Sequence, residues 1–460
     1  MRIFPPFIDV KAEDGFGNGN DIFGRKKIAD QMTSLLGRVD EPIVLALDGP
    51  WGSGKTTFLR QWQAELNRGG YPVVYFDAFA NDFHDDAFLP IASEIIALAN
   101  SRMESAKGKL DKFRERAIDV GKFLLRSTAR IALKGVTLNT LDLPDFEGVA
   151  AEEAEKIFEH YVGDLLASHA QSQSTMQMFR TALAELPSLL TDEKSGGAEQ
   201  KPLILIVDEL DRCRPTFSLQ LLERVKHFFS VPSVHFVLGT NLEQLVNSIA
   251  VAYGPNVNGR EYLQKFIHLT INLQDVFDRQ TQTTASVFLD RIRNAVALEG
   301  QDRDVLESCI EELRRISDHH NLSLRTIEQV FSHVVRAIVS TPLDAFKNSA
   351  LLSGLAVLKV LEPVLFRKAK NGSLTFSEVV GVLGLQDLGT SVQNEASSAF
   401  SYKRNWVQKF WRYSADPDCP PEINREMGTL VVRYNFWSRE SLLPYVANEQ
   451  IDRFQSVEKR

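Results

Sequence analysis

The 460-residue sequence has no long hydrophobic run, only three cysteines and no excess of positive charge. No stretch reaches the roughly 18 uncharged apolar residues that a membrane-spanning helix needs, and the N-terminus lacks the apolar core of a secretion signal. Cys213, Cys309 and Cys419 are far apart in the sequence, which argues against a zinc site or a disulfide framework and for a reducing compartment. We therefore expect a cytoplasmic protein without a transmembrane segment.

The formal net charge is -8, so the whole molecule has no general attraction to nucleic acid or to an anionic membrane. Any surface of that kind must be local. Hydrophobic residues make up 44% of the chain and charged residues 24%, as in soluble globular proteins. A chain of this length exceeds one core of ordinary size, which predicts two or three domains.

The clearest motif is GPWGSGKTTFL, residues 49–59, which follows the apolar run PIVLAL. It fits G-x-x-x-x-G-K-[ST], a loop whose glycines let successive backbone N–H groups point at phosphate oxygens. In that motif Lys55 reaches the β- and γ-phosphates and the Thr56 hydroxyl binds Mg²⁺, while a helix that starts near Lys55 adds its positive end. The predicted phosphate-binding residues are Gly49, Pro50, Trp51, Gly52, Ser53, Gly54, Lys55, Thr56 and Thr57.

A second motif, KPLILIVDELDRCRP, is an apolar run over residues 201–215 that ends in two carboxylates. Such a run predicts a strand buried on both faces of a parallel sheet. At its end, Asp208 is placed to hold Mg²⁺ through water, and Glu209 to orient and deprotonate an attacking water. The two carboxylates could instead cap the next helix, but beside a complete phosphate loop we favour catalysis.

Three further segments, 71–79, 234–241 and 266–273, are predicted strands. Strands that alternate with helices predict a doubly wound parallel sheet with its site at the carboxyl ends of the strands. The segment 234–241 ends in Thr240 and Asn241, where a sensor of the γ-phosphate would lie. We take Asn241 as the candidate.

Together these segments resemble the KAP family of P-loop NTPases over residues about 20–335. The resemblance rests on GPWGSGKTTFL, YFDAFANDFHDDAFLPIASEI, LILIVDELDRCRP, VHFVLGTNLEQL and REYLQKFIHLTINL, in that order. It implies ATP and Mg²⁺ as cofactors, and its bacterial members look like components of anti-phage defence. The family often carries transmembrane helices between the two motifs, whereas this chain has a polar segment there. Asn241 also departs from the family's usual aspartate.

The motifs and the apolar spacing together predict an α/β P-loop NTPase core, a three-layer parallel sheet whose two halves are residues 1–100 and 200–277. A helical insertion would occupy residues 101–199, and a helical lid residues 278–345. A small C-terminal domain, rich in helices and aromatic residues, would follow over residues 346–460. In the resembled family an arginine that opens the last lid helix faces the γ-phosphate, which implies this role for Arg325. The alternative for Arg325 is an exposed residue at a helix N-terminus.

The predicted insertion begins with a basic stretch, in which Arg102–Lys134 holds ten Lys or Arg residues against four acidic ones. A basic amphipathic helix can contact a membrane, a nucleic acid or a partner protein. We favour a solvated helix whose apolar stripe packs against neighbouring helices. As the binding partner we favour a protein encoded nearby over nucleic acid.

Three other segments allow two interpretations each. Residues 21–36 could contact adenine through Ile22 and Phe23, with Arg25 structural, or form an N-terminal core helix. The aspartates around His84 in residues 79–88 could bind metal, but a solvated turn or helix cap is favoured. The last sixty residues could stack on single-stranded nucleic acid, but a buried core is favoured. Their aromatic and basic residues are Tyr402, Trp406, Phe410, Trp411, Tyr413, Tyr434, Phe436, Trp437, Lys403, Arg404, Lys409, Arg412 and Arg433.

We interpret the sequence as an ATP hydrolase that switches or drives a partner. The absence of an N-K-x-D guanine motif favours ATP over GTP. The alternatives are a nucleotide-gated scaffold with little turnover, a nucleic-acid-dependent ATPase and, less favoured, a phosphotransferase. We expect a homo-oligomer, because many such ATPases receive an arginine from a neighbouring subunit. Arg224 and Arg260 are the candidates for that arginine.

Overall fold

The computed structural model describes residues 14–84, 86–102, 111, 113–116, 118, 174–191, 200–273, 283–385, 399–434 and 438–453. The chain divides into two compact units, whose cores lie within residues 14–273 and 283–453. Most of the predicted insertion, including Lys107, Lys109 and Lys112, lies outside the described residues, as does Asp85. Within the described part, no helix is both long and apolar enough to cross a membrane.

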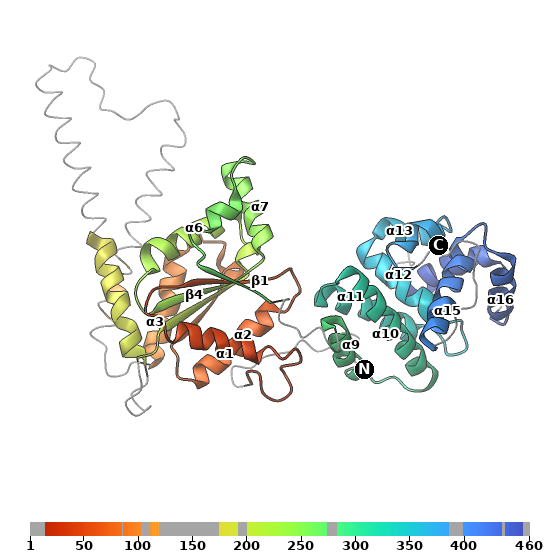
Figure 1. The fold of residues 1–460 in the computed structure, drawn as a ribbon, viewed down its shortest axis with the longest axis horizontal. Helices are drawn as coiled ribbons and strands as arrows, with labels where there is room; N and C mark the ends of the chain where they lie inside the picture. Colours follow the sequence, from red (N-terminus) through yellow and green to blue (C-terminus); the bar gives the residue numbers. More distant parts are fainter. Residues whose placement is uncertain are drawn as a thin grey trace, which may run out of the picture. The chain divides into compact units, whose positions relative to one another are not determined.

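The first unit is built on a sheet of five parallel strands in the order β2-β3-β4-β1-β5 (Figure 1). The strands are β1 (Val44–Asp48), β2 (Val73–Asp77), β3 (Leu203–Asp208), β4 (Val234–Thr240) and β5 (Leu269–Asn272). All five lie within or overlap the apolar runs that predicted them. The register pairs Asp48 with Thr240, and Asp208 with both Gly239 and Asp77. The last residues of the central strands therefore meet at one edge.

Helices cover both faces of this sheet. Figure 1 shows α1 (Lys26–Leu36) and α2 (Lys55–Arg68) on one side, and α6 (Pro215–Arg224) and α7 (Leu242–Tyr253) on the other. Helix α3 (Phe88–Arg102) contacts β2 and contributes to the same core as α6 and α7. Alternate residues of β3 divide between the faces: Ile204 and Ile206 join the core under α1 and α2, and Leu205 and Val207 join the other. The unit is thus the predicted three-layer α/β P-loop fold.

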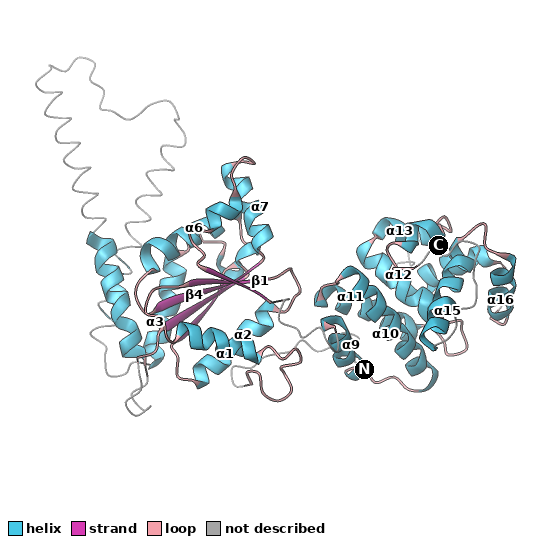
Figure 2. Ribbon diagram, viewed as in Figure 1, coloured by secondary structure: helices cyan, strands magenta, loops and turns pink. Residues whose placement is uncertain are grey.

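All regular secondary structure in the described part of the second unit is helical (Figure 2). Its longer helices are α9 (Thr284–Asn294), α10 (Gly300–His320), α11 (Leu324–Ser340), α12 (Ser349–Leu361), α13 (Pro363–Lys370), α15 (Ala399–Ala415) and α16 (Pro421–Val432). Shorter helices are α14 (Phe376–Val380) and α17 (Leu442–Tyr445). One hydrophobic core runs through all of them.

That single core corrects the division predicted at residues 345 and 346. Helix α12 buries every residue from Ala350 to Leu358, and α10 and α11 from the predicted lid and α15 from the predicted C-terminal domain contact it. Because no separate core exists on either side of residue 345, the described parts of the predicted lid and C-terminal domain form one structural unit. The predicted lid helices themselves are present as α9, α10 and α11.

The C-terminal aromatic residues are mainly core residues. Phe410, Trp411 and Tyr413 are buried, and the Trp411 indole N–H donates a hydrogen bond to the Ala350 carbonyl oxygen. Their burial confirms the core interpretation for these three residues, because a buried ring is not available for stacking on nucleic acid. Tyr434 is exposed, and Phe436 and Trp437 lie outside the described residues.

Candidate functional site: the phosphate loop and its carboxylates

The predicted phosphate loop connects β1 to α2. Gly52 has a φ of +78° and Gly54, the residue before α2, a φ of +87°, both in the left-handed region that favours glycine. The loop can therefore turn sharply without a Cβ, and the first N–H groups of α2 have no partner within the helix. Such an N-terminus favours an anion. Trp51 is 47% exposed, and Ser53 is buried.

Lys55 is buried at the start of α2 and folds back over the loop. Its Nζ donates hydrogen bonds to the carbonyl oxygens of Gly49 at 2.6 Å and Pro50 at 3.2 Å. Burial lowers the pKa of the Lys55 ammonium, and the nearby carboxylates of Asp211 and Asp208 counteract that effect. The side chain thus lies among the loop's own oxygens, where an incoming phosphate could replace the carbonyl oxygens as its partner.

Asp208 ends β3 with a side chain that is 1% exposed. Burial raises the pKa of its carboxyl group, while hydrogen bonds from the side chains of Tyr75 and Thr56 and from the Glu209 backbone N–H oppose the rise. The Thr56 hydroxyl and the Asp208 carboxylate supply the hard oxygen donors that Mg²⁺ takes in proteins. The residues present therefore fit a Mg²⁺ ion at the loop.

Glu209 adopts a left-handed backbone, with a φ of +59°, directly after β3. Such a conformation is uncommon for a residue other than glycine, and it often marks a functional position. The Glu209 carboxylate forms an ion pair with Arg212 at 2.6 Å. Burial raises the pKa of Glu209, and the charge of Arg212 acts in the opposite direction. The predicted base is therefore next to Asp208 but engaged by an arginine.

Asn241 lies at the end of β4, as predicted, but its side chain caps α7. Its Oδ1 accepts the backbone N–H groups of Glu243 at 3.1 Å and Gln244 at 3.4 Å. Cap geometry is a sufficient structural reason for asparagine here. The amide Nδ2 takes no part in that cap. A role as phosphate sensor for Asn241 thus stays a prediction.

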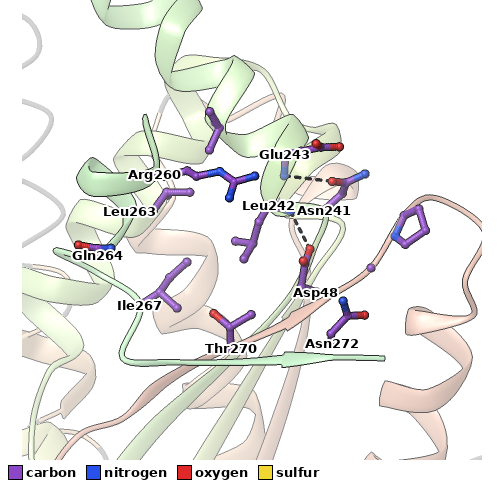
Figure 3. Close-up of a pocket in the computed structure, with 13 residues that line it drawn as sticks. Asp48, Asn241, Leu242, Glu243, Arg260, Leu263, Gln264, Ile267, Thr270 and Asn272 are labelled. Atoms are coloured by element: carbon purple, nitrogen blue, oxygen red, sulfur yellow. Dashed lines mark hydrogen bonds between the residues drawn. The ribbon is translucent and has the colours of Figure 1, made fainter. Parts of the chain in front are cut away.

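A cavity of about 440 Å³ adjoins the start of the phosphate loop (Figure 3). Arg260 projects into it from α8 (Gly259–Leu263), and Asp48 accepts the backbone N–H of Leu242 at its edge. Lys55, Thr56, Asp208 and Glu209 do not line it, so it lies beside the two candidate carboxylates and not around them. The lining residues are Asp48, Gly49, Pro50, Asn241, Leu242, Glu243, Val246, Arg260, Leu263, Gln264, Ile267, Thr270 and Asn272.

The two candidate arginines for a neighbouring subunit differ in their surroundings. The Nε and Nη2 of Arg224 donate hydrogen bonds to Asp86 Oδ2 at 3.0 and 2.6 Å. Both side chains are largely buried, so Arg224 is paired within its own chain. Its role as a trans-acting arginine stays a prediction. Arg260 is exposed at the cavity. Arg325 is an exposed residue in the first turn of α11, and its predicted contact with phosphate stays a prediction.

The aspartates around His84 have structural partners. Asp82 pairs with Arg214, and Asp86 accepts the Phe88 backbone N–H at 2.8 Å at the start of α3. Among the described residues no group of three or more histidine, cysteine and carboxylate side chains is placed to hold a metal ion. The favoured interpretation as a turn and helix cap is confirmed for these two aspartates.

The segment 21–36 includes the core helix α1. Ile28, Met32 and Leu36 bury one face of this helix, while Asp21 accepts the backbone N–H groups of Arg25 and Lys26. Arg25 is buried beside the Phe23 ring, and burial lowers its pKa to about 10. Arg25 is thus structural, as expected, and a contact of Ile22 or Phe23 with adenine stays a prediction.

Tyr75 and Gly239, which flank Asp208 on the two neighbouring strands, were not predicted as site residues. The Tyr75 hydroxyl donates to Asp208 Oδ2 at 2.6 Å, and a Cβ on Gly239 would lie 2.5 Å from Asp208 Oδ1. Both lie in segments that carry the family resemblance, but neither was singled out as a site residue. The available signal was positional, because a tyrosine two residues before the end of β2 and a glycine one residue before the end of β4 flank the end of β3.

Comparison with known proteins identifies a family for most of the chain. A model described as the KAP family P-loop domain matches residues 25–338. No curated protein sequence matches the chain. Among solved structures, the chain is similar to one titled "Structure of the Aeropyrum Pernix ORC2 protein (ADPNP-ADP complexes)", with 11% sequence identity and a TM-score of 0.34 over 98% of this chain and 96% of that one. A TM-score of 0.34 is too low for this similarity to indicate a shared fold or function.

Proposed function

Because the chain belongs to the KAP family of P-loop domains, we propose that it binds ATP with Mg²⁺ and hydrolyses it. The observation that carries the proposal is the proximity of the two motifs: helix α2, which begins at Lys55 of the phosphate loop, contacts β3, and Lys55 lies close enough to the buried Asp208 at the end of β3 for the two charges to act on each other's pKa. A hydroxyl such as that of Thr56 and a carboxylate near a helix N-terminus suit a metal-bound triphosphate.

In this proposal each residue has a separate task. The backbone N–H groups of residues 49–57, other than Pro50, bind the phosphates, and Lys55 exchanges its two carbonyl partners for phosphate oxygens. Thr56 and Asp208 would hold Mg²⁺, which neutralises charge on the phosphates when bound. Asn241 and Arg325 are proposed to sense the γ-phosphate.

Glu209 is the proposed base for the attacking water. It follows Asp208 directly, and its raised pKa makes its carboxylate a better proton acceptor than an exposed glutamate. The ion pair with Arg212 must open or be shared for the carboxylate to take the proton, since a paired oxygen is a weaker base. Hydrolysis would then depend on the position of Arg212.

The test is a comparison of two variants. Glu209→Gln should keep ATP bound while steady-state hydrolysis stops, because the water loses its base and the phosphate loop is unchanged. Lys55→Ala should instead lose affinity for ATP. Hydrolysis at the wild-type rate in the Glu209→Gln protein would reject this assignment.

We also propose that nucleotide turnover switches or drives a protein partner. The resemblance to bacterial KAP proteins supports a role in anti-phage defence and a partner encoded nearby, and the basic stretch 102–134 is our candidate for its contact. A partner of this kind would co-purify with the full chain and be lost when the insertion is deleted. Tight, salt-sensitive binding to DNA would instead favour a nucleic-acid-dependent ATPase. Stable assembly without turnover would favour the scaffold.

The proposed homo-oligomer would place Arg260 of one subunit at the phosphate of another. Mixing Lys55→Ala subunits with Arg260→Gln subunits tests this arrangement, because a mixed interface pairs an intact loop with an intact arginine. Recovery of hydrolysis above that of either variant alone supports action in trans. No recovery, with specific activity independent of protein concentration, would assign Arg260 to its own chain.

A further inference from the structure

The carboxylate of Asp208 is held by donors at both oxygens. Oδ2 accepts the Tyr75 hydroxyl at 2.6 Å, and Oδ1 accepts the Glu209 backbone N–H at 2.9 Å. The side chain is 1% exposed, so water does not compete for these contacts. The missing Cβ of Gly239 provides the space in which Oδ1 lies. The plane of the carboxylate is therefore set by its neighbours before any ligand arrives.

Tyr75 reaches Asp208 because β2 and β3 are parallel neighbours. Their register pairs Tyr75 with Ile206 and Asp77 with Asp208, and the Tyr75 and Asp208 side chains lie on the α2 face of the sheet. Arg60 of α2 lies over the phenol ring, with 3.4 Å between its guanidinium carbon and the ring centroid. A cation over an aromatic face restrains the ring from the solvent side.

A fixed orientation matters for a carboxylate that binds a metal or its water. The partners that hydrogen-bond to a metal ligand set the direction of its free electron pairs, and their loss commonly reduces metal affinity 10- to 100-fold. The backbone donor from Glu209 cannot be removed by substitution, and Thr56 is itself a proposed ligand. Tyr75 is thus the donor that can orient the Asp208 carboxylate without being a proposed metal ligand itself.

We propose that Tyr75 is a positioning residue for the Mg²⁺ site, which orients Asp208 through its hydroxyl. This inference rests on the proposed function, since it concerns the metal that accompanies the nucleotide. It assigns a role in metal recognition to β2, a strand that contributes neither of the two sequence motifs. Arg60, which restrains the ring, supports the same arrangement from α2.

The experiment measures how strongly Mg²⁺ promotes nucleotide binding to the full chain. The probe is a fluorescent, non-hydrolysable ATP analogue, and the measured quantity is the ratio of its Kd in EDTA to its Kd in saturating Mg²⁺. In Tyr75→Phe this ratio should fall roughly tenfold, while the Kd in EDTA stays within about twofold of wild type, because the phosphate loop keeps its N–H groups.

Tyr71→Phe is the matched control, because it removes a hydroxyl just before β2 from a ring that packs beneath Lys201. Its ratio should equal that of wild type. If Tyr75→Phe does not fold, Arg60→Gln provides the second test, since it releases the ring without removing the hydroxyl; the ratio should then fall by a smaller factor.

The outcomes separate this inference from the proposed function. An unchanged ratio in folded Tyr75→Phe, or in Arg60→Gln where only that variant folds, would show that Tyr75 only fills the core, while nucleotide binding stands. Absence of Mg²⁺-promoted binding in the wild-type chain would reject the proposed function itself. A lower melting temperature with an unchanged ratio would also overturn the inference.

Discussion

Gly239 in β4 is the position where one added methyl group should disturb both the fold and the site. The register places Gly239 beside Asp208, and a Cβ there would lie 2.5 Å from Asp208 Oδ1 and 2.5 Å from Leu59 Cδ1. Asp208 is 1% exposed and Leu59 is fully buried. Both neighbours are packed on all sides, so the alanine methyl group can fit only by pushing one of them out of its position.

The expected cost follows from that crowding. Overpacking a well-packed core by one methyl group destabilises a protein by about 1–3 kcal/mol, and we expect Gly239→Ala to lie in this range. If the Asp208 carboxylate is the group that moves, it also loses its set orientation. The factor by which Mg²⁺ promotes nucleotide binding should then fall roughly tenfold, as for loss of a residue that orients a metal ligand.

Amide hydrogen exchange is the suitable assay, because peptides from β3 and β4 report on the first unit without contributions from the helical unit. Gly69→Ala is the matched control, since Gly69 has ordinary backbone angles and a Cβ there would meet its nearest atoms at 3.4 Å. This variant should change the unfolding free energy derived from amide exchange by less than about 1 kcal/mol. Wild-type protection and wild-type Mg²⁺ dependence in Gly239→Ala would refute the packing argument.

Two further predictions concern ion pairs and protonation. Arg224→Gln and Asp86→Asn should each lower the unfolding free energy of the first unit by about 2 kcal/mol. The double variant should lower it by little more than either single variant, and chemical denaturation measures all three. Burial and the charge of Lys359 lower the pKa of His333 to about 4, below the roughly 6.5 of an unfolded chain. The unfolded state therefore takes the proton first, so the helical unit should lose stability as pH falls from about 6.5 to about 4. His333→Gln should remove that part of the pH dependence in thermal melts, and an unaltered pH profile would contradict the assignment.

The sequence predicted the sheet and the phosphate loop because both depend on local signals. Apolar runs bounded by turns specify buried strands, and the positive φ angles of Gly52 and Gly54 are implied by the loop motif itself. The choice of side-chain partners depends on tertiary packing instead. Periodicity alone does not reveal that Asn241 caps α7 or that Arg224 pairs with a carboxylate 138 residues away.

The same limit explains the predicted boundary at residue 345. The helical spacing of residues 278–340 alone predicts a complete lid. The described part of α12 is buried along nearly its whole length, however, so it needs partners on several sides. The predicted lid and the predicted C-terminal domain both supply them. A helix with apolar residues all round predicts such burial, but it does not say which neighbours provide it.

Hydrolysis of ATP is tested most directly by measuring the release of inorganic phosphate by the purified full chain. The account predicts continuous release in Mg²⁺, loss of release in EDTA, and no release from Lys55→Ala under either condition, because the loop and its metal act together. Equal rates from the wild-type and Lys55→Ala proteins in Mg²⁺ would contradict the account.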